Sequence, residues 1–461
     1  MLFNDYAFLL VFLPASLVIY RFADPHPPQW RIGVLVILSF VFYSYWNPLF
    51  IILLALSITV NWLAARGYLA TKRGGFITGS IVANLAVLGF FKYANFVSDN
   101  LAYLFERPLW HFNIALPLGI SFFTFHHIMY LVDLRRGKAP DYSLGRYALY
   151  ISFFPQSIAG PLARWSEVMH QFGRQAYAPG WQRQFAVGVT FIVIGLIEKT
   201  WLADPLGRLL DPIYAQAIHG PVTNGNSWPA LGFAFQVLFD FAGYCDVAIG
   251  VGLLFGVQLP YNFNAPLRST NLQDFWQRWH ITLMTFLRDY VFIPLSNVKI
   301  GRKRYRLVQH FSAMLLTMAL CGLWHGASWT FVLWGALHGC ALVIVSLWRR
   351  YGPRLPALLG WALTAIFVLL TCVIFRAGSM EAAMNIYRGL AELPDLERSL
   401  RSAPIIIAAL CAFLLPASQD IVAGLTERPK TAIAAVLGLA AVAILVELGD
   451  RDAYEFVYFQ F

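Results

Sequence analysis

The stretch that decides the fold runs over residues 275–339 and holds three motifs: FWQRWHITL at residues 275–283, LCGLWHGASW at residues 320–329 and LWGALHG at residues 333–339. Each motif places one histidine close to tryptophans, in sequence apolar enough to be buried in lipid. An ionisable group at membrane depth is costly, so we treat His280, His325 and His338 as candidate functional residues. The rest of the chain is expected to be their scaffold.

The composition is that of a polytopic membrane protein. Of the 461 residues, 59% are hydrophobic and 13% are charged, whereas soluble domains carry about 25% charged residues. Apolar runs close to the roughly 20 residues that span a bilayer recur along the chain. We therefore expect an all-α fold in a single domain, residues 1–461, with about 10–14 transmembrane or re-entrant helices.

The basic residues of this chain have a topological explanation. The net charge of +10 could suggest a nucleic-acid partner, but the lysines and arginines cluster in short loops between apolar runs. The positive-inside rule accounts for such loops, so no nucleic-acid partner is expected and the N-terminus is placed outside. The five cysteines have no paired spacing, so neither a disulfide framework nor a metal site is expected.

The length of one apolar run singles out a particular histidine. Residues 311–348 are almost uncharged, and as one straight helix they would be about 57 Å long. A bilayer core of about 30 Å does not accommodate that length, so the run must break, most simply within residues 322–328. The break puts His325 at a helix end inside the protein, where a neutral imidazole can act as a general base. A lone buried histidine is more often a packing residue, but three histidines with four tryptophans, broken helices and a nearby acid-bearing span leave packing and catalysis equally open for His325.

An acid-bearing span precedes this stretch. Residues 233–255 are long enough to cross a membrane, and within them Asp240 and Tyr244 are four residues apart and share a helix face. These positions fit either a structural ion-pair network or the lining of a site. The arginines expected to pair with the buried carboxylates are Arg268, Arg278 and Arg288.

Other catalytic motifs are missing from the sequence. It contains no G-x-S-x-G, no H-E-x-x-H and no phosphate-binding G-x-x-x-x-G-K-[ST]. Histidine-centred group transfer is therefore the simplest enzymatic reading. A transmembrane carrier without covalent chemistry is the alternative, because broken helices and intramembrane charges also mark substrate paths, although no internal repeat supports it.

The motifs around His280 and His325 closely resemble the membrane-bound O-acyltransferase family. The best match is its AlgI-type branch, which O-acetylates alginate and is related to the transferases that D-alanylate teichoic acids. Further matching segments follow in family order over essentially the whole chain: PLGISFFTFHHIMYLVD, FFPQSIAGPLARW, FDFAGYCDVAIGVGLLFG, LPYNFNAPLRS and the terminal YFQF. Two departures are Gln277, where relatives usually have Arg or Lys, and Ser296-Asn297, which replaces a Gly-Gly pair.

The resemblance implies helices around a central tunnel and a pair of catalytic histidines. The family's invariant histidine corresponds to His325 and its second histidine to His280. His325 is expected to act as general base on an acceptor hydroxyl or to take the acyl group itself, while His280 orients it or donates to the oxyanion. The residues expected to line the tunnel are Trp324, Trp279, Asp240, Tyr244, Asn262 and Asp289.

The resemblance also implies a donor and partners. We expect no bound cofactor and acetyl-CoA as acyl donor, whose phosphates could meet Arg302, Lys303 and Arg304 unless these serve topology alone. The expected location is the bacterial inner membrane, with multiple spans, contact with membrane lipids and a periplasmic N-terminus. A periplasmic or membrane-anchored partner protein would pass the acetyl group to an exported polysaccharide. Alginate, cellulose, peptidoglycan and teichoic acid all remain open as acceptors.

Overall fold

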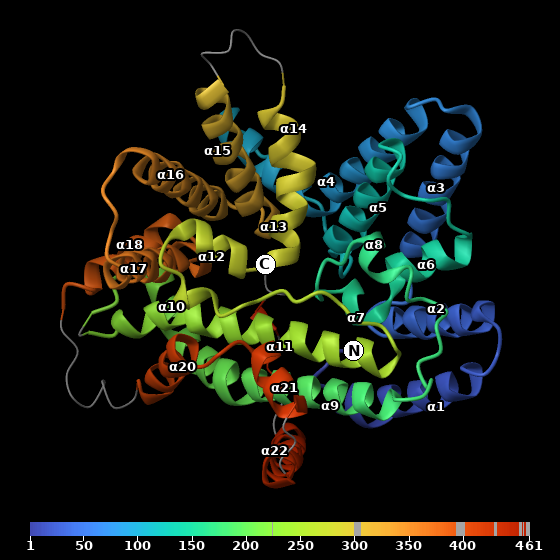
Figure 1. The fold of residues 1–461 in the computed structure, drawn as a ribbon. Coiled ribbons are helices and arrows are strands. Elements are labelled where there is room, and N and C mark those ends of the chain that lie inside the picture. Colours follow the sequence, from blue (N-terminus) through green and yellow to red (C-terminus); the bar gives the residue numbers. More distant parts are fainter. Residues whose placement is uncertain are drawn as a thin grey trace. The chain divides into compact units, whose positions relative to one another are not determined.

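The computed structural model describes residues 1–223, 225–298, 306–392, 402–427, 431–450, 454 and 456–457. Within this part of the chain every regular element is a helix (Figure 1). The expected all-α class is therefore confirmed.

The chain packs as two compact units that alternate along the sequence. The first unit comprises Met1–Ile194, Tyr244–Tyr261 and Leu425–Ala453, and the second comprises Gly195–Gly243, Asn262–Gly424 and Tyr454–Phe461. Helices α9 (Trp181–Ile197) and α11 (Phe233–Leu254) each contribute residues to both units. The single domain expected from the sequence stays a prediction.

Eight helical segments in the described residues are long and apolar enough to cross a membrane. They are α3 (Phe50–Thr71), α4 (Gly75–Leu104), α9 with α10 (Asp204–His219), α11, α15 (Arg306–His325), α16 (Trp329–Tyr351), α17 (Ala357–Arg376) and α22 (Thr431–Asp450). The bent pair α20 (Ala403–Leu414) and α21 (Ser418–Glu427) would make a ninth. The chain is thus a multi-pass membrane protein, and shorter apolar helices account for the larger number expected.

Hydrogen bonds between buried polar side chains join helices of the first unit. Besides α3, α4 and α22, this unit contains α1 (Leu13–Ala23), α2 (Pro28–Ser44), α5 (Ile120–Arg135), α6 (Leu144–Ser152), α7 (Phe154–Ser157) and α8 (Trp165–Val168). His127 on α5 lies 2.6 Å from the Tyr147 hydroxyl on α6 and 3.3 Å from the Ser57 hydroxyl on α3. Asn61 and Asn84 exchange hydrogen bonds between α3 and α4. Without a hydrophobic driving force inside lipid, such pairs help to hold helices together.

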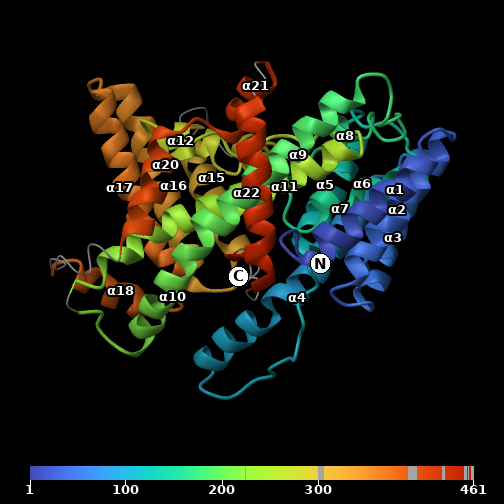
Figure 2. The same ribbon diagram turned by 90° about the horizontal axis from the view of Figure 1, so that it is seen from below.

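The second unit is built around the hairpin of α15 and α16. Short helices lie beside it: α12 (Leu272–Arg278), α13 (Ile281–Leu287) and α14 (Ile293–Ser296). The amphipathic α18 (Met380–Gly389) packs instead against α10 and α17. Figure 2 shows α16 beside α17, which packs against it. Within the hairpin, a Cβ atom on Gly322 would overlap the Phe331 carbonyl oxygen, and one on Gly335 would overlap that of Met318. The two antiparallel helices therefore meet backbone to backbone.

The turn of this hairpin is the break predicted from length. Helix α15 ends at His325 and α16 begins at Trp329. Ser328 caps the start of α16, where its hydroxyl oxygen accepts a hydrogen bond from the Thr330 amide at 3.3 Å. The break lies within the predicted residues 322–328, and His325 is a buried helix end. Both expectations are confirmed.

Close packing at Gly322 can be tested by adding one methyl group. Gly322→Ala should lower the melting temperature of the detergent-solubilised protein, because overpacking costs about 1–3 kcal/mol. The control is Gly89→Ala on α4, where a new Cβ would meet nothing within 4 Å. There the melting temperature should stay unchanged or rise, since alanine favours helices over glycine by about 0.5–1 kcal/mol. An undiminished melting temperature for Gly322→Ala would contradict the packing described.

Candidate active site

His280 occupies a second break, between α12 and α13. Its backbone is left-handed, with φ 45° and ψ 51°, which a residue with a Cβ seldom adopts. A neighbouring loop supplies the hydrogen bonds that the broken helix lacks. The Asn264 amide donates to the Arg278 carbonyl and the Ile281 amide to the Asn262 carbonyl, each at 2.9 Å. The break is thus stabilised inside the protein.

One amide oxygen determines where His280 carries its proton. Asn262 Oδ1 accepts hydrogen bonds from the Thr282 amide at 3.2 Å and from the Thr282 hydroxyl at 2.9 Å. The same oxygen lies 3.1 Å from His280 Nδ1, so Nδ1 must be the protonated nitrogen. His280 is fully buried, and burial favours the neutral form of an imidazole. The basic nitrogen of His280 is therefore Nε2.

The rings of the two predicted catalytic histidines both lie close to the ring of one tryptophan. The ring of Trp324 is 6.1 Å from that of His280 and 4.7 Å from that of His325, measured between centroids. Phe241 covers His280 edge-on at 4.7 Å, and Phe375 lies 5.0 Å from His325. The structure thus brings together His325, His280, Trp324 and, through its bond to His280, Asn262.

His338 lies in the wall behind this cluster. The ring of Trp334 contacts both His338 and His325, at centroid distances of 4.7 and 5.5 Å respectively. His338 Nε2 lies 3.0 Å from the Thr371 hydroxyl, which itself donates to the Phe367 carbonyl. The hydroxyl therefore accepts from Nε2, and His338 is held in place by packing and this bond.

A cavity of about 510 Å³ lies in the second unit, and its lining includes Ile281, the residue that follows His280 in the sequence. Most of its walls come from α12, α13, α15 and α16. Its walls are largely apolar and rich in methionine, whose flexible side chains adapt to ligands. The polar members of the lining are Gln273, Gln277, Thr285, Arg288 and Thr317. Such a cavity can accept an extended chain with few charges.

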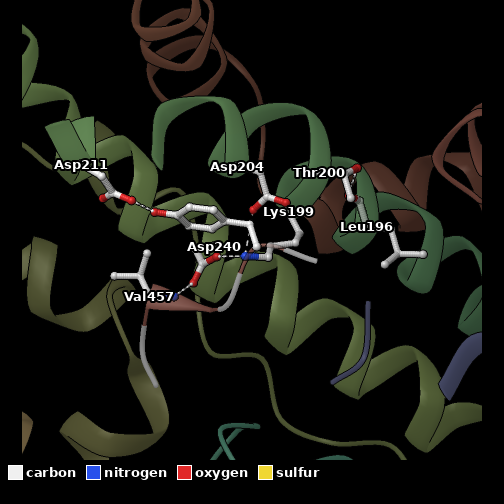
Figure 3. Close-up of polar contacts among 8 residues, drawn as sticks. Leu196, Lys199, Thr200, Asp204, Asp211, Asp240 and Val457 are labelled. Carbon is white, nitrogen blue, oxygen red and sulfur yellow. Dashed lines mark hydrogen bonds and ion pairs between the residues drawn. The ribbon is translucent and has the colours of Figure 1, made fainter. Parts of the chain in front are cut away.

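Asp240 belongs to a buried ion-pair cluster. Figure 3 shows Lys199 between two carboxylates, with its Nζ 2.7 Å from Asp240 and 2.8 Å from Asp204. Lys199 sits on a π-helical turn, Glu198–Ala203, and all three side chains are buried. The second Asp240 oxygen accepts the Val457 amide at 2.8 Å, so the end of the chain closes the cluster.

The arginine partners expected for Asp240 are therefore wrong. Arg278 pairs with Asp274 and Arg288 with Asp289, each at 2.7 Å, and Arg268 reaches the Leu415 carbonyl. Lys199 was overlooked, although a lysine within an apolar run is itself a signal of a buried partner.

The other predicted lining residues have different surroundings. Tyr244 stacks on Phe3 at 4.7 Å in the first unit, although Asp240, one turn earlier, belongs to the second. Trp279 lies between Phe275 and Phe263, at 5.6 and 5.1 Å.

The remaining predicted site residues carry charges. Asp289 forms an ion pair with Arg288, and Arg288 is the member of the pair that lines the cavity. Arg302, Lys303 and Arg304 lie outside the described residues. Within the described residues, no group of three or more His, Cys, Asp or Glu side chains could hold a metal ion.

Comparison with known proteins assigns the fold to a family. Residues 68–382 match the description of the MBOAT, membrane-bound O-acyltransferase family. The chain belongs to this family. It is 36% identical to a peptidoglycan O-acetyltransferase of Helicobacter pylori over 85% of this chain and 80% of that protein. It is also 36% identical to a probable alginate O-acetylase AlgI of Azotobacter vinelandii, over 93% and 88% respectively.

A more distant relative acts with a different acyl group. A teichoic acid D-alanyltransferase of Streptococcus thermophilus is 32% identical over 50% of this chain and 57% of that protein. The chain is thus a membrane-bound O-acyltransferase, and the two histidines around Trp324 lie within the matched residues.

Substitution of Lys199 tests whether it balances the charge of the two buried carboxylates. Lys199→Met should leave two buried carboxylates without a cation, a change that costs about 3–5 kcal/mol. The yield of monodisperse O-acyltransferase should fall sharply, whereas Lys138→Met in an exposed loop should leave it unchanged. Adding Asp204→Asn and Asp240→Asn to Lys199→Met should restore part of the yield. Normal yield from Lys199→Met alone would contradict the ion-pair assignment.

Asn262 can be tested through the ring that it holds. Asn262→Ala removes the acceptor for His280 Nδ1 and for the Thr282 amide, so the imidazole can change tautomer. A positioned acid or base contributes roughly 10²–10⁴-fold to the rate, and Asn262→Ala should remove part of that contribution. The rate of acyl transfer should therefore fall at least about 10-fold. The control is Asn264→Ala, whose exposed side chain lies in the same loop. Equal rates for the two variants would show that Asn262 does not set the state of His280.

Proposed function

We propose that this O-acyltransferase moves an acetyl group from cytoplasmic acetyl-CoA across the bacterial inner membrane for O-acetylation of an exported polysaccharide such as alginate. The single observation that carries the proposal is that the rings of His280 and His325 both lie near the ring of Trp324, at 6.1 and 4.7 Å. The names of the relatives, which act on alginate and on peptidoglycan, support acetyl transfer to a polymer.

In the proposed reaction, His325 is the general base. Its imidazole takes the proton of an acceptor hydroxyl while the oxygen attacks the thioester carbonyl, and the C–S bond then breaks. The departing thiolate, with a pKa near 8.5 for an ordinary thiol, takes up the proton from the imidazolium. The sequence expectation also allowed an acetyl group on His325 itself, which would add one transfer before the acceptor enters.

The tautomer of His280 refines its expected role. With Nδ1–H bound to Asn262, the neutral ring has no proton on Nε2 and cannot donate to an oxyanion. It can accept a hydrogen bond, so in this proposal His280 orients His325 or the incoming hydroxyl. We therefore assign it a positioning role.

The cavity beside Ile281 is the proposed place for the donor's thioester arm. Its apolar walls suit that arm, and the aromatic rings around both histidines exclude water, which would otherwise hydrolyse an activated acyl group. Arg302, Lys303 and Arg304 stay a proposal for the donor's phosphates. A periplasmic or membrane-anchored partner protein would complete delivery to the polysaccharide.

The function is tested with purified protein and acetyl-CoA labelled in its acetyl group. A transferase should release CoA and pass the label to acceptor oligosaccharides, whereas a carrier without covalent chemistry should leave the thioester intact. Supplying alginate, peptidoglycan, cellulose and teichoic acid fragments in parallel identifies the acceptor. Label on peptidoglycan fragments alone would replace alginate in the proposal.

His325→Ala should lower the transfer rate by about 10²–10⁴-fold, the range that a positioned base contributes. His310→Ala provides a matched control, because His310 lies on the same helix, is exposed and is remote from the break. Both variants should elute as folded protein. Full activity in His325→Ala would remove His325 from the mechanism.

A further inference from the structure

A groove of about 690 Å³ opens at the arginine-rich turn between α16 and α17. Arg349, the last-turn residue of α16, and Arg354, in the following loop, line one part of it. The groove lies in the second unit and shares no lining residue with the cavity that Ile281 lines. The mechanism above makes no use of it.

The polar part of the groove is built for an anion. Arg349 donates one N–H group to the Gln273 side chain, and a guanidinium has further donors to offer. No acidic side chain is among the described residues that line the groove, so neither arginine is neutralised there. Two uncompensated arginines in one concave site favour a ligand with phosphate-like charge.

The other part of the groove is built for hydrocarbon. Ile344 and Leu363 line it on α16 and α17, with 62% and 53% of their surfaces exposed. Trp348 stands between these residues and Arg349, and tryptophan favours the boundary between lipid tails and head groups. A soluble phosphate would leave this apolar wall uncovered, whereas a phospholipid fits both parts.

We propose that this groove binds an anionic phospholipid, with its phosphate at Arg349 and Arg354 and an acyl chain along Ile344 and Leu363. Basic pockets between membrane helices are suited to such head groups. The turn is also where the charge pattern places the cytoplasmic face, on which the lipid phosphates would meet the two arginines.

The groove is linked to the catalytic break through α12. Gln273, the residue that Arg349 contacts, also donates to the Ser346 hydroxyl at 2.8 Å and so ties the start of α12 to α16. Three residues later, the Trp276 ring lies 5.2 Å from that of His338, and the helix then leads to His280. The bound lipid therefore steadies the segment that positions His280. This consequence for activity rests on the proposed function, whereas lipid binding does not.

The test uses the full-length protein in nanodiscs of phosphatidylglycerol or phosphatidylcholine. After exchange into detergent, native mass spectrometry should detect phosphatidylglycerol retained by the wild type. Arg354→Gln should bind it about five-fold more weakly, and Arg349→Gln/Arg354→Gln roughly thirty-fold, as expected from the loss of one and two surface charges. Arg350→Gln is the matched control, because Arg350 lies over the Tyr351 ring and does not line the groove. It should retain the lipid like the wild type.

Activity is measured in the same nanodiscs. The wild type should transfer acetyl groups faster in phosphatidylglycerol than in phosphatidylcholine, and the double variant should lose this difference. Equal lipid loss from Arg350→Gln, or full retention by the double variant, would overturn the proposal. The proposal would also fail if the double variant retained the lipid but had a higher KM for acetyl-CoA in both lipids. The groove would then be a site for the phosphates of the donor. If no protein releases CoA, the proposed function fails, and the binding measurement still decides the lipid site.

Discussion

Hydrocarbon cannot satisfy the hydrogen bonds of an interrupted helix, and this constraint governs the arrangement of the active site. Both predicted catalytic histidines stand at interruptions. At His280, the loop of residues 262–264 supplies backbone partners, and at His325, the Ser328 hydroxyl caps the next helix. Protein must therefore enclose each break, and the enclosure is what brings aromatic rings around the two imidazoles.

The same hydrogen bonds set the chemistry. Asn262 uses one oxygen to hold a backbone amide, a hydroxyl and an imidazole, so the fold of the break and the tautomer of His280 depend on one side chain. Thr371 fixes the other tautomer of His338, because its hydroxyl oxygen accepts a hydrogen bond from Nε2–H. Two histidines of one cluster thus carry their protons on different nitrogens, Nδ1 in His280 and Nε2 in His338, despite similar burial.

Bilayer thickness made part of this site predictable. The length of residues 311–348 required a break, and the break singled out His325 from sequence alone. The partner of Asp240 was not predictable in this way, because Lys199 lies 41 residues away and Val457 lies 217 residues away. Charge alone pointed to three arginines, of which Arg278 and Arg288 pair with carboxylates close to them in sequence and Arg268 donates to a backbone carbonyl. Periodicity and length describe a helix, whereas the choice of ion-pair partner depends on which helices pack together.

The α15–α16 hairpin also places the proposed lipid groove far from His325. Because α15 and α16 are antiparallel, Arg349 lies near the start of α15, and His325 lies at its other end, 20 residues or about 30 Å away. A phosphate at Arg349 is therefore too distant to act on the reacting groups directly. Met318, in the wall of the cavity that Ile281 lines, is only seven residues before His325, or about 10 Å along the helix. The cavity thus lies beside the part of α15 that leads to His325, whereas the groove is connected to the break at His280 through α12.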